Sequence, residues 1–291
     1  MRLKSALRRG VAAAVIAGIV VSSGIPAYAA QWDIADGNIT VKAGDAEGTN
    51  RVTQGEKDVE DTDTVITGES KENTVTIDTS KGNVDVTFDD LKIDASDKGE
   101  AAVRVEGNGD VTIELDGDNE LKSGGYNAGL EKNEHESEGT LTIKDDKGKD
   151  GSLTAEGGEG GGAGIGGGKE STGSSITIRG GTVEAVGGSS AAGIGDGAYR
   201  ASDDTDDPNP GKLYICGDAE VTAKAGSQMM TDAKAPAIGG TYGEVPTESL
   251  SDADHKVTGG RLTRLNADGT VMEGMGYDYT STPVSYTHLR A

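Results

Sequence analysis

Short runs of alternating apolar and polar residues recur along most of this chain. Within each run the apolar residues lie two positions apart, usually with Thr, Tyr or a charged residue between them. Successive side chains of a strand point to opposite faces, so each run would turn its apolar groups inward and its polar group outward. No amphipathic helical pattern appears beyond the apolar N-terminal run. The sequence therefore predicts an all-β protein.

The runs form a repeat of three strands in a fixed order. The first strands start at positions 86, 111, 141, 176 and 213, which are 25, 30, 35 and 37 residues apart. They are Val86-Thr87-Phe88, Val111-Thr112-Ile113, Leu141-Thr142-Ile143, Ile176-Thr177-Ile178 and Leu213-Tyr214-Ile215. The second strands are Leu91-Lys92-Ile93, Leu121-Lys122-Ser123, Leu153-Thr154-Ala155, Val183-Glu184-Ala185 and Val221-Thr222-Ala223. The third are Ala101-Ala102-Val103, Ala128-Gly129-Leu130, Ala163-Gly164-Ile165, Ala192-Gly193-Ile194 and Pro236-Ala237-Ile238. Gly, Asp, Asn and Ser between them favour tight corners.

This order predicts a right-handed parallel β-helix with about five to seven three-strand rungs. An antiparallel β-sandwich is the structural alternative, but it should show hairpin spacing without a fixed three-strand order. Repeat lengths that vary only at the corners favour the coil, because insertions in repeat proteins map to loops. We expect a capping segment at 30–64, repeats at 65–245, and a terminal rung or cap at 246–280.

The alternation predicts that the glycines of the third strand lie on its outer face. If Ala163 and Ile165 point inward, Gly164 points outward, and Gly129 and Gly193 do the same on neighbouring rungs. The third face would then be a flat strip of bare backbone that another chain can approach closely. The alternative is that these glycines only permit sharp bends.

The two ends of the chain differ from the repeat. Four basic residues precede an apolar run at 11–21, and Ala27-Tyr28-Ala29 forms a small-residue cleavage site. This pattern predicts a signal peptide at 1–29 cleaved after Ala29, a secreted or cell-surface protein, and no membrane span in the mature chain. Residues 281–291 lack the repeat, and their end looks like a translated sequencing adapter, so we expect a non-native tail.

Composition narrows the classes of partner. The formal net charge is −23, which disfavours binding to nucleic acid or to anionic membranes because both carry negative charge. The run 162–167 matches the glycine spacing of a dinucleotide loop, but the helix that such a loop requires does not follow it. Cys216 is the single cysteine, so no intramolecular disulfide framework exists.

Two segments carry a resemblance to a known family. Asp110 to Glu131, DVTIELDGDNELKSGGYNAGLE, and Gly162 to Gly188 resemble secreted carbohydrate-binding β-helix proteins of anaerobic bacteria. Those proteins are similar in fold to polysaccharide lyases and include calcium-coordinating members that bind plant polysaccharides. The resemblance covers about residues 32 to 275 and implies a polysaccharide partner, either of the plant cell wall or a host glycan.

Aromatic residues are scarce, which makes their positions informative. Tyr126, Tyr199 and Tyr242 each lie in a segment next to a third strand. Stacked rungs would bring such loop residues toward one edge, where Tyr rings suit sugar rings because they combine an apolar face with a polar tip. We therefore name these three as candidate carbohydrate-binding residues, with isolated loop packing as the alternative.

An acidic insertion is the candidate metal site. Its four carboxylates belong to Asp203, Asp204, Asp206 and Asp207. Ca²⁺ takes six to eight oxygen ligands, so Ca²⁺ is the cofactor expected if this loop binds one. The alternative is a solvated acidic loop, because the spacing of an EF-hand is missing.

A lyase of this fold would need carboxylates and a basic Arg or Lys on adjacent outer strand positions. The outward residues of the first strand are Thr87, Thr112, Thr142, Thr177 and Tyr214, and those of the second strand are Lys92, Lys122, Thr154, Glu184 and Thr222. Together they offer too few carboxylates beside too few bases. We therefore expect a secreted, non-catalytic polysaccharide-binding protein. A polysaccharide lyase of the same fold and a structural cell-surface protein or adhesin remain the alternatives.

Overall fold

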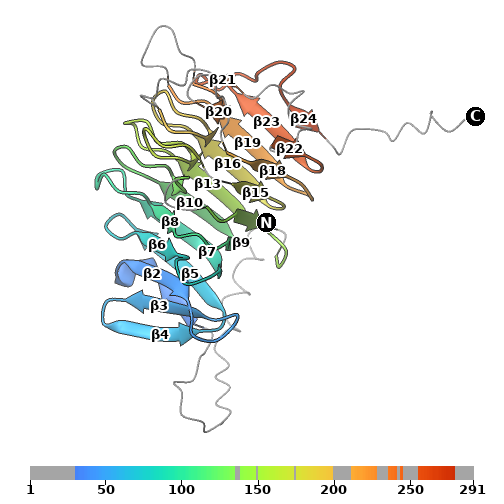
Figure 1. Ribbon diagram of the computed structural model, residues 1–291. Coiled ribbons are helices and arrows are strands. Elements are labelled where there is room, and N and C mark those ends of the chain that lie inside the picture. Colours follow the sequence, from blue (N-terminus) through green and yellow to red (C-terminus); the bar gives the residue numbers. More distant parts are fainter. Residues whose placement is uncertain are drawn as a thin grey trace, which may run out of the picture.

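Strands and their connecting turns make up almost all of the described structure. The computed structural model describes residues 30–134, 138–148, 150–173, 175–198, 211–227, 235–240, 243–244 and 255–278. The strands stack side by side in long parallel sheets along the length of the molecule (Figure 1). One 3-10 helix, η1 (Ile34–Asp36), interrupts them near the start. In the described part of the chain, no helix is long and apolar enough to cross a membrane.

The first sheet contains two columns of strands that meet at one long strand, β7 (Val84–Asp94). The first column continues with β9 (Val111–Asp116), β12 (Leu141–Lys144), β15 (Ile176–Ile178), β18 (Leu213–Ile215) and β22 (His255–Val257). The second continues with β10 (Asp118–Lys122), β13 (Ser152–Glu156), β16 (Thr182–Val186), β19 (Glu220–Lys224) and β23 (Arg261–Leu265). These neighbours pair in parallel, and β24 (Tyr277–Asp278) closes the second column in antiparallel pairing with β23.

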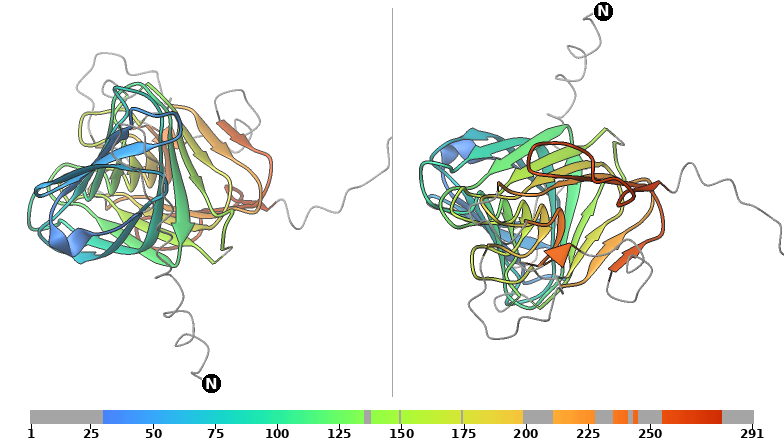
Figure 2. Two further views of the ribbon diagram at one scale, coloured as in Figure 1. Left: turned by 90° about the horizontal axis from the view of Figure 1, so that it is seen from below. Right: turned by 90° about the horizontal axis from the view of Figure 1, so that it is seen from above.

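The second sheet forms a third column. It contains β2 (Ile39–Ala43), β6 (Val75–Asp78), β8 (Val103–Glu106), β11 (Leu130–Glu131), β14 (Ile165–Gly166), β17 (Ile194–Gly195) and β20 (Ile238–Gly240), all paired in parallel. The antiparallel strand β21 (Gly243–Glu244) follows β20. In the two end views the strands of successive turns overlap around a shared interior (Figure 2). The all-β prediction and the long parallel sheets are confirmed, and the arrangement is consistent with a β-helix or solenoid-like architecture.

An antiparallel meander adjoins the third column at the N-terminal end. Strands β3 (Asn50–Gln54) and β4 (Lys57–Asp61) extend β2, while β1 (Ala30–Asp33) pairs in parallel with β5 (Thr64–Ser70), which pairs with β7. The buried indole of Trp32 donates its Nε1–H to Asp61 Oδ2 over 2.7 Å. This hydrogen bond joins the first strand to the last strand of the meander.

The core consists of apolar ladders that cross the strands. In the first column, Ile113, Ile143, Ile178 and Ile215 lie in register on neighbouring strands and are fully buried. Burial of these aliphatic groups is the main favourable contribution to folding, and the ladders explain how a chain with 3% aromatic residues forms a core. The inward positions predicted from the alternation in these strands are confirmed.

The structure corrects the predicted register in two places. Val84, and not Val86, pairs with Val111, and Leu121 pairs with Ala155, so Asn119 takes the position that Leu153 has in the next turn. Both errors are shifts of two residues. Such a shift leaves every side chain on the same face, so an alternating pattern cannot detect it, whereas a shift of one would exchange the faces.

The predicted bare strip of outward glycines is wrong. Gly129, Gly164 and Gly193 are buried. A Cβ on Gly164 would lie 2.5 Å from the backbone N of Val186, and one on Gly193 would lie 2.7 Å from the backbone N of Lys224. The third-column strands begin only at the following residue, Leu130, Ile165 or Ile194. The glycines therefore lie in the corner, where the end of the second-column strand passes close by.

Candidate functional site

Of the residues predicted to form the site, Tyr126 is the one that lies in the described structure. Tyr126 is 61% exposed in the corner between β10 and β11, and Lys169 Nζ lies 4.6 Å from the centroid of its ring. The other candidates lie outside the described residues: Ala29, Tyr199, Tyr242, Asp203, Asp204, Asp206 and Asp207. Among the residues that the structure describes, no group of three or more His, Cys, Asp or Glu side chains could hold a metal ion.

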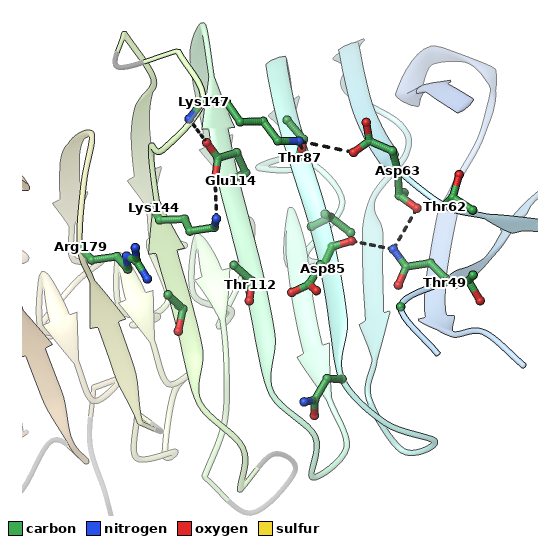
Figure 3. Close-up of a pocket in the computed structure, with 16 residues that line it drawn as sticks. Thr49, Thr62, Asp63, Asp85, Thr87, Thr112, Glu114, Lys144, Lys147 and Arg179 are labelled. Carbon is green, nitrogen blue, oxygen red and sulfur yellow. Dashed lines mark hydrogen bonds and ion pairs between the residues drawn. The ribbon is translucent and has the colours of Figure 1, made fainter. Parts of the chain in front are cut away.

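A polar groove lies instead on the outer surface of the first column (Figure 3). Its volume is about 530 Å³. Strands β7, β9 and β12 provide its floor, and segments 48–50 and 62–64 form the wall at the N-terminal end. Lys147 and Arg179 complete the opposite side. We call this feature the first-column groove.

Two rows of side chains pave the floor of the groove. Asp85, Thr112 and Thr142 form one row across the strands, since each pairs with the next in register. Two residues further along each strand, Thr87 pairs with Glu114 and Glu114 pairs with Lys144. Neighbouring strands are about 4.8 Å apart, so each row repeats a polar group at that interval.

Glu114 anchors the turn that follows β12. The residue is only 3% exposed, and its Oε1 accepts hydrogen bonds from the backbone N of Asp146 over 2.7 Å and of Lys147 over 2.6 Å. Its Oε2 forms an ion pair with Lys144 Nζ at 3.0 Å. Glu114 therefore fixes both the turn and the side chain of Lys144 relative to the floor.

The cations of the groove are all paired with carboxylates. Asp146 contacts Lys144 Nζ at 3.0 Å and Arg179 Nη2 at 3.2 Å. Partial burial acts to lower the pKa of Lys144, but the hydrogen bonds and charges of Asp146 and Glu114 outweigh it, so this pKa is raised. Lys144 consequently remains a charged ammonium group at neutral pH.

The wall of the groove is tied to the floor by direct contacts. Asn50 Nδ2 donates to Thr64 Oγ1 over 2.9 Å and to the backbone O of Asp85 over 2.6 Å. On the other side, Lys147 Nζ lies 3.4 Å from both Asp63 Oδ1 and Thr87 Oγ1, so it bridges the mouth between turn and wall (Figure 3). These contacts hold the groove in shape before any ligand arrives.

The groove differs in charge from the chain as a whole. Its lining contains three carboxylates, Asp63, Asp85 and Glu114, and three cations, Lys144, Lys147 and Arg179, so it is formally neutral. The whole chain carries −23. A ligand that the general surface repels would meet balanced charge here.

The sequence-based conclusion that carboxylates and bases are too few on the outer strand positions is wrong for the first column. It counted three residues per strand, whereas β9 and β12 run far enough to add Glu114 and Lys144, and Arg179 directly follows β15. The register shift also hid Asp85. Extending each alternating run by one more step of two residues would have revealed this second row.

Comparisons of the chain with protein-family models, curated proteins and solved structures find no match.

Proposed function

We propose that this protein is a secreted, non-catalytic carbohydrate-binding protein whose polysaccharide ligand lies in the first-column groove. The proposal includes the finer fold, a right-handed parallel β-helix with five to seven rungs of three strands, which the three columns of paired strands support. The observation that carries it is the pair of polar rows across adjacent strands, which offers hydroxyl, carboxylate and cationic groups at a regular interval. A linear polymer with a regular repeat matches such a surface.

The chemistry of the floor suits sugar hydroxyls. Each sugar hydroxyl both donates and accepts hydrogen bonds, and the side chains of Thr112 and Thr142 have the same double capacity. Asp85 is exposed and provides acceptors, while Lys147 and Arg179 provide donors. Binding sites typically fix a ligand through a small number of such placed polar groups.

The cations indicate an acidic polysaccharide as the preferred ligand class. Arg179 is half exposed, at 49% of its side chain, and its guanidinium group can present two parallel N–H donors to a carboxylate. Lys147 adds a compact positive charge at the mouth. Because the groove is neutral within an acidic protein, a polymer of sugar acids would meet its least repulsive surface there.

A polysaccharide lyase is the second candidate, favoured by the convergence of Glu114, Lys144 and Arg179 on one outer face. A lyase needs a group that accepts a proton from the sugar, and the pKa of that group should lie near the working pH. The raised pKa of Lys144 disfavours it in that role. The geometry therefore supports binding better than cleavage, because binding requires no proton acceptor.

Calcium assistance remains a prediction, as does export. The acidic loop with Asp203 and the signal peptide ending at Ala29 both lie outside the described residues. No step of the proposed binding depends on a metal ion.

The test uses the purified protein on polygalacturonate, xylan and cellulose, each with Ca²⁺ and with a chelator. We expect retention on polygalacturonate, weakened by salt because part of the attraction is electrostatic. Ultraviolet absorbance of unsaturated products would show that the protein is a lyase. Failure to be retained on every one of these polysaccharides would refute the binding proposal.

A further inference from the structure

The outward row that contains Thr112 and Thr142 continues past the end of the groove. Thr142 pairs with Thr177, Thr177 pairs with Tyr214, and Tyr214 pairs with Lys256. Each step crosses to the next strand of the first column. An aromatic ring therefore stands in the same line as the hydroxyl groups of the floor, three strands beyond Thr112.

Large apolar side chains are rarely exposed in the part of the chain that the structure describes, which makes this ring distinctive. In the described ranges three large apolar side chains are exposed: Tyr126, Tyr214 and Val271. Tyr214 is 37% exposed, and of the three it is the one that belongs to the row paving the groove. Tyr126 lies away from that row, and Lys169 occupies a position over its ring.

The ring of Tyr214 is fixed at its tip. Thr258 Oγ1 donates a hydrogen bond to Tyr214 Oη over 3.0 Å, and the backbone N of Thr258 donates to Ile215 O over 2.9 Å. The hydroxyl that holds the ring thus comes from a segment that is itself attached to the strand of Tyr214. A ring held in this way loses little conformational freedom when a ligand stacks on it.

Two cationic side chains, Arg179 and Lys256, lie on opposite sides of this ring along the column. Arg179 directly follows β15, the strand that pairs with the strand of Tyr214 on the groove side. Lys256 is exposed on the far side. A sugar ring over Tyr214 would have positive charge within reach in both directions along the polymer.

We propose that Tyr214 forms a separate subsite that stacks on a pyranose ring and extends the first-column groove. This inference rests on the proposed function and adds the path and minimum length of the ligand. Three strand spacings separate Thr112 from Tyr214, about 14 Å at roughly 4.8 Å each. The polymer lies across the strands, and only a chain of several sugars reaches from the groove to the ring.

The experiment measures the affinity of digalacturonate and hexagalacturonate for the wild-type protein and for three variants. Tyr214→Ala removes the ring, Tyr214→Phe keeps it, and Val271→Ala is the control for an exposed apolar side chain outside the row. We expect Tyr214→Ala to weaken hexagalacturonate binding about two- to thirteenfold and to leave digalacturonate binding unchanged, since one aromatic contact contributes about 0.5–1.5 kcal/mol. Tyr214→Phe should retain most of the hexagalacturonate affinity, because it loses only the hydrogen bond to Thr258. Val271→Ala should bind both oligomers as the wild type does.

A fluorescence readout tests the same subsite independently of affinity. The natural Trp32 is buried, so a Tyr214→Trp variant introduces an exposed indole on the row. Its emission should change with hexagalacturonate and not with digalacturonate. Hexagalacturonate binding that is undiminished in Tyr214→Ala, with silent emission from Tyr214→Trp, would overturn the subsite while leaving the proposed function intact. If the wild-type protein binds neither oligomer nor polygalacturonate, the subsite and its acidic ligand class both fail.

Discussion

Glu114 and Lys147 are joined by a hydrogen bond that fixes the turn beside the groove. The backbone N of Lys147 donates to Glu114 Oε1 over 2.6 Å, and the side chain of Lys147 then reaches across to Asp63 at 3.4 Å. Glu114 is buried and belongs to the floor, whereas Lys147 lies at the mouth. One buried carboxylate thereby holds the backbone position from which a cation extends at the mouth of the groove.

Loss of Glu114 should destabilise both the fold and this turn. Glu114→Ala leaves two backbone amides without their acceptor and removes one of the two carboxylates paired with Lys144, so we expect the unfolding free energy in urea to fall by about 3 kcal/mol. Glu114→Gln keeps an oxygen acceptor and should cost about 1 kcal/mol. In hydrogen exchange, the amides of Asp146 and Lys147 should lose protection in the Ala variant.

Glu120 supplies the matched control. It also pairs with a lysine, Lys92, at 2.7 Å, but its side chain is 61% exposed. An exposed ion pair contributes little, so Glu120→Gln should change the unfolding free energy by less than about 1 kcal/mol. Equal losses for Glu114→Ala and Glu120→Gln would show that Glu114 has no anchoring role.

The buried glycines of the third column give a prediction about packing. A Cβ on Gly164 would lie within 2.8 Å of three backbone atoms, so Gly164→Ala forces two strands apart and should cost about 3 kcal/mol. Gly48 has a φ of +74° and open space around it, so Gly48→Ala should cost only about 1 kcal/mol of backbone strain. Thermal unfolding of the two variants compares them directly. A Gly164→Ala variant as stable as the wild type would contradict the buried position of Gly164 and support an outward glycine strip.

Lys132 should make stability depend on alkaline pH. Burial lowers its pKa from 10.5 to about 8 in the folded protein, against an opposing effect of Asp110. Between pH 8 and 10.5 the unfolded chain therefore binds a proton that the folded protein does not, so unfolding free energy gains a contribution that rises with pH. Below pH 8 this contribution is constant and unfavourable to folding.

The measurement is the difference in unfolding free energy between wild type and Lys132→Met across that range. Subtracting the unfolding free energy of the variant at each pH cancels the contributions of all other titrating groups. The difference should move in favour of the wild type as pH rises from 8 to 10.5. A difference that stays flat, or moves the other way, would show that Lys132 titrates as a solvated lysine does.

The sequence predicted those parts of the fold that depend on alternation. The inward orientation of Ile residues such as Ile113 and Ile143 was predicted correctly. Burial determines which face of the strand an apolar side chain occupies, and not the exact position along the strand. The pairing register was not fixed by that pattern, which explains the shifts at Val84 and Asn119. Asn119 in particular is a buried polar residue in a position where the pattern predicts a Leu.

Asn119 shows why such a position escapes sequence reasoning. Its Oδ1 accepts from the backbone N of Leu91 over 2.9 Å, and its Nδ2 donates to the backbone O of Ser152 over 3.0 Å. A buried amide is acceptable only because these partners exist, and they lie 28 and 33 residues away along the chain. Their proximity follows from the stacking of turns and cannot be derived from local composition.

The first-column groove was not predicted from the sequence, for a related reason. Tyr126, Tyr199 and Tyr242 were chosen because aromatic residues are scarce, which says nothing about where loops lie relative to one another. The groove is assembled from residues as distant as Asp63 and Arg179, and its second row lies just beyond the apolar core of each short strand. Tyr214 was assigned an outward position from the sequence, but its alignment with the groove required the register.

Polygalacturonate affinity of Lys147→Ala and Arg179→Ala, compared with Lys122→Ala, tests the role of the groove most directly. Lys122 is the matched control because its side chain is 52% exposed, close to the 58% of Lys147, and it pairs with Glu156 on the second column. We expect each groove variant to weaken binding about tenfold, the effect of losing one charge-assisted contact, and Lys122→Ala to bind as the wild type does. Equal affinity in all four proteins, or a loss confined to Lys122→Ala, would contradict binding in the first-column groove.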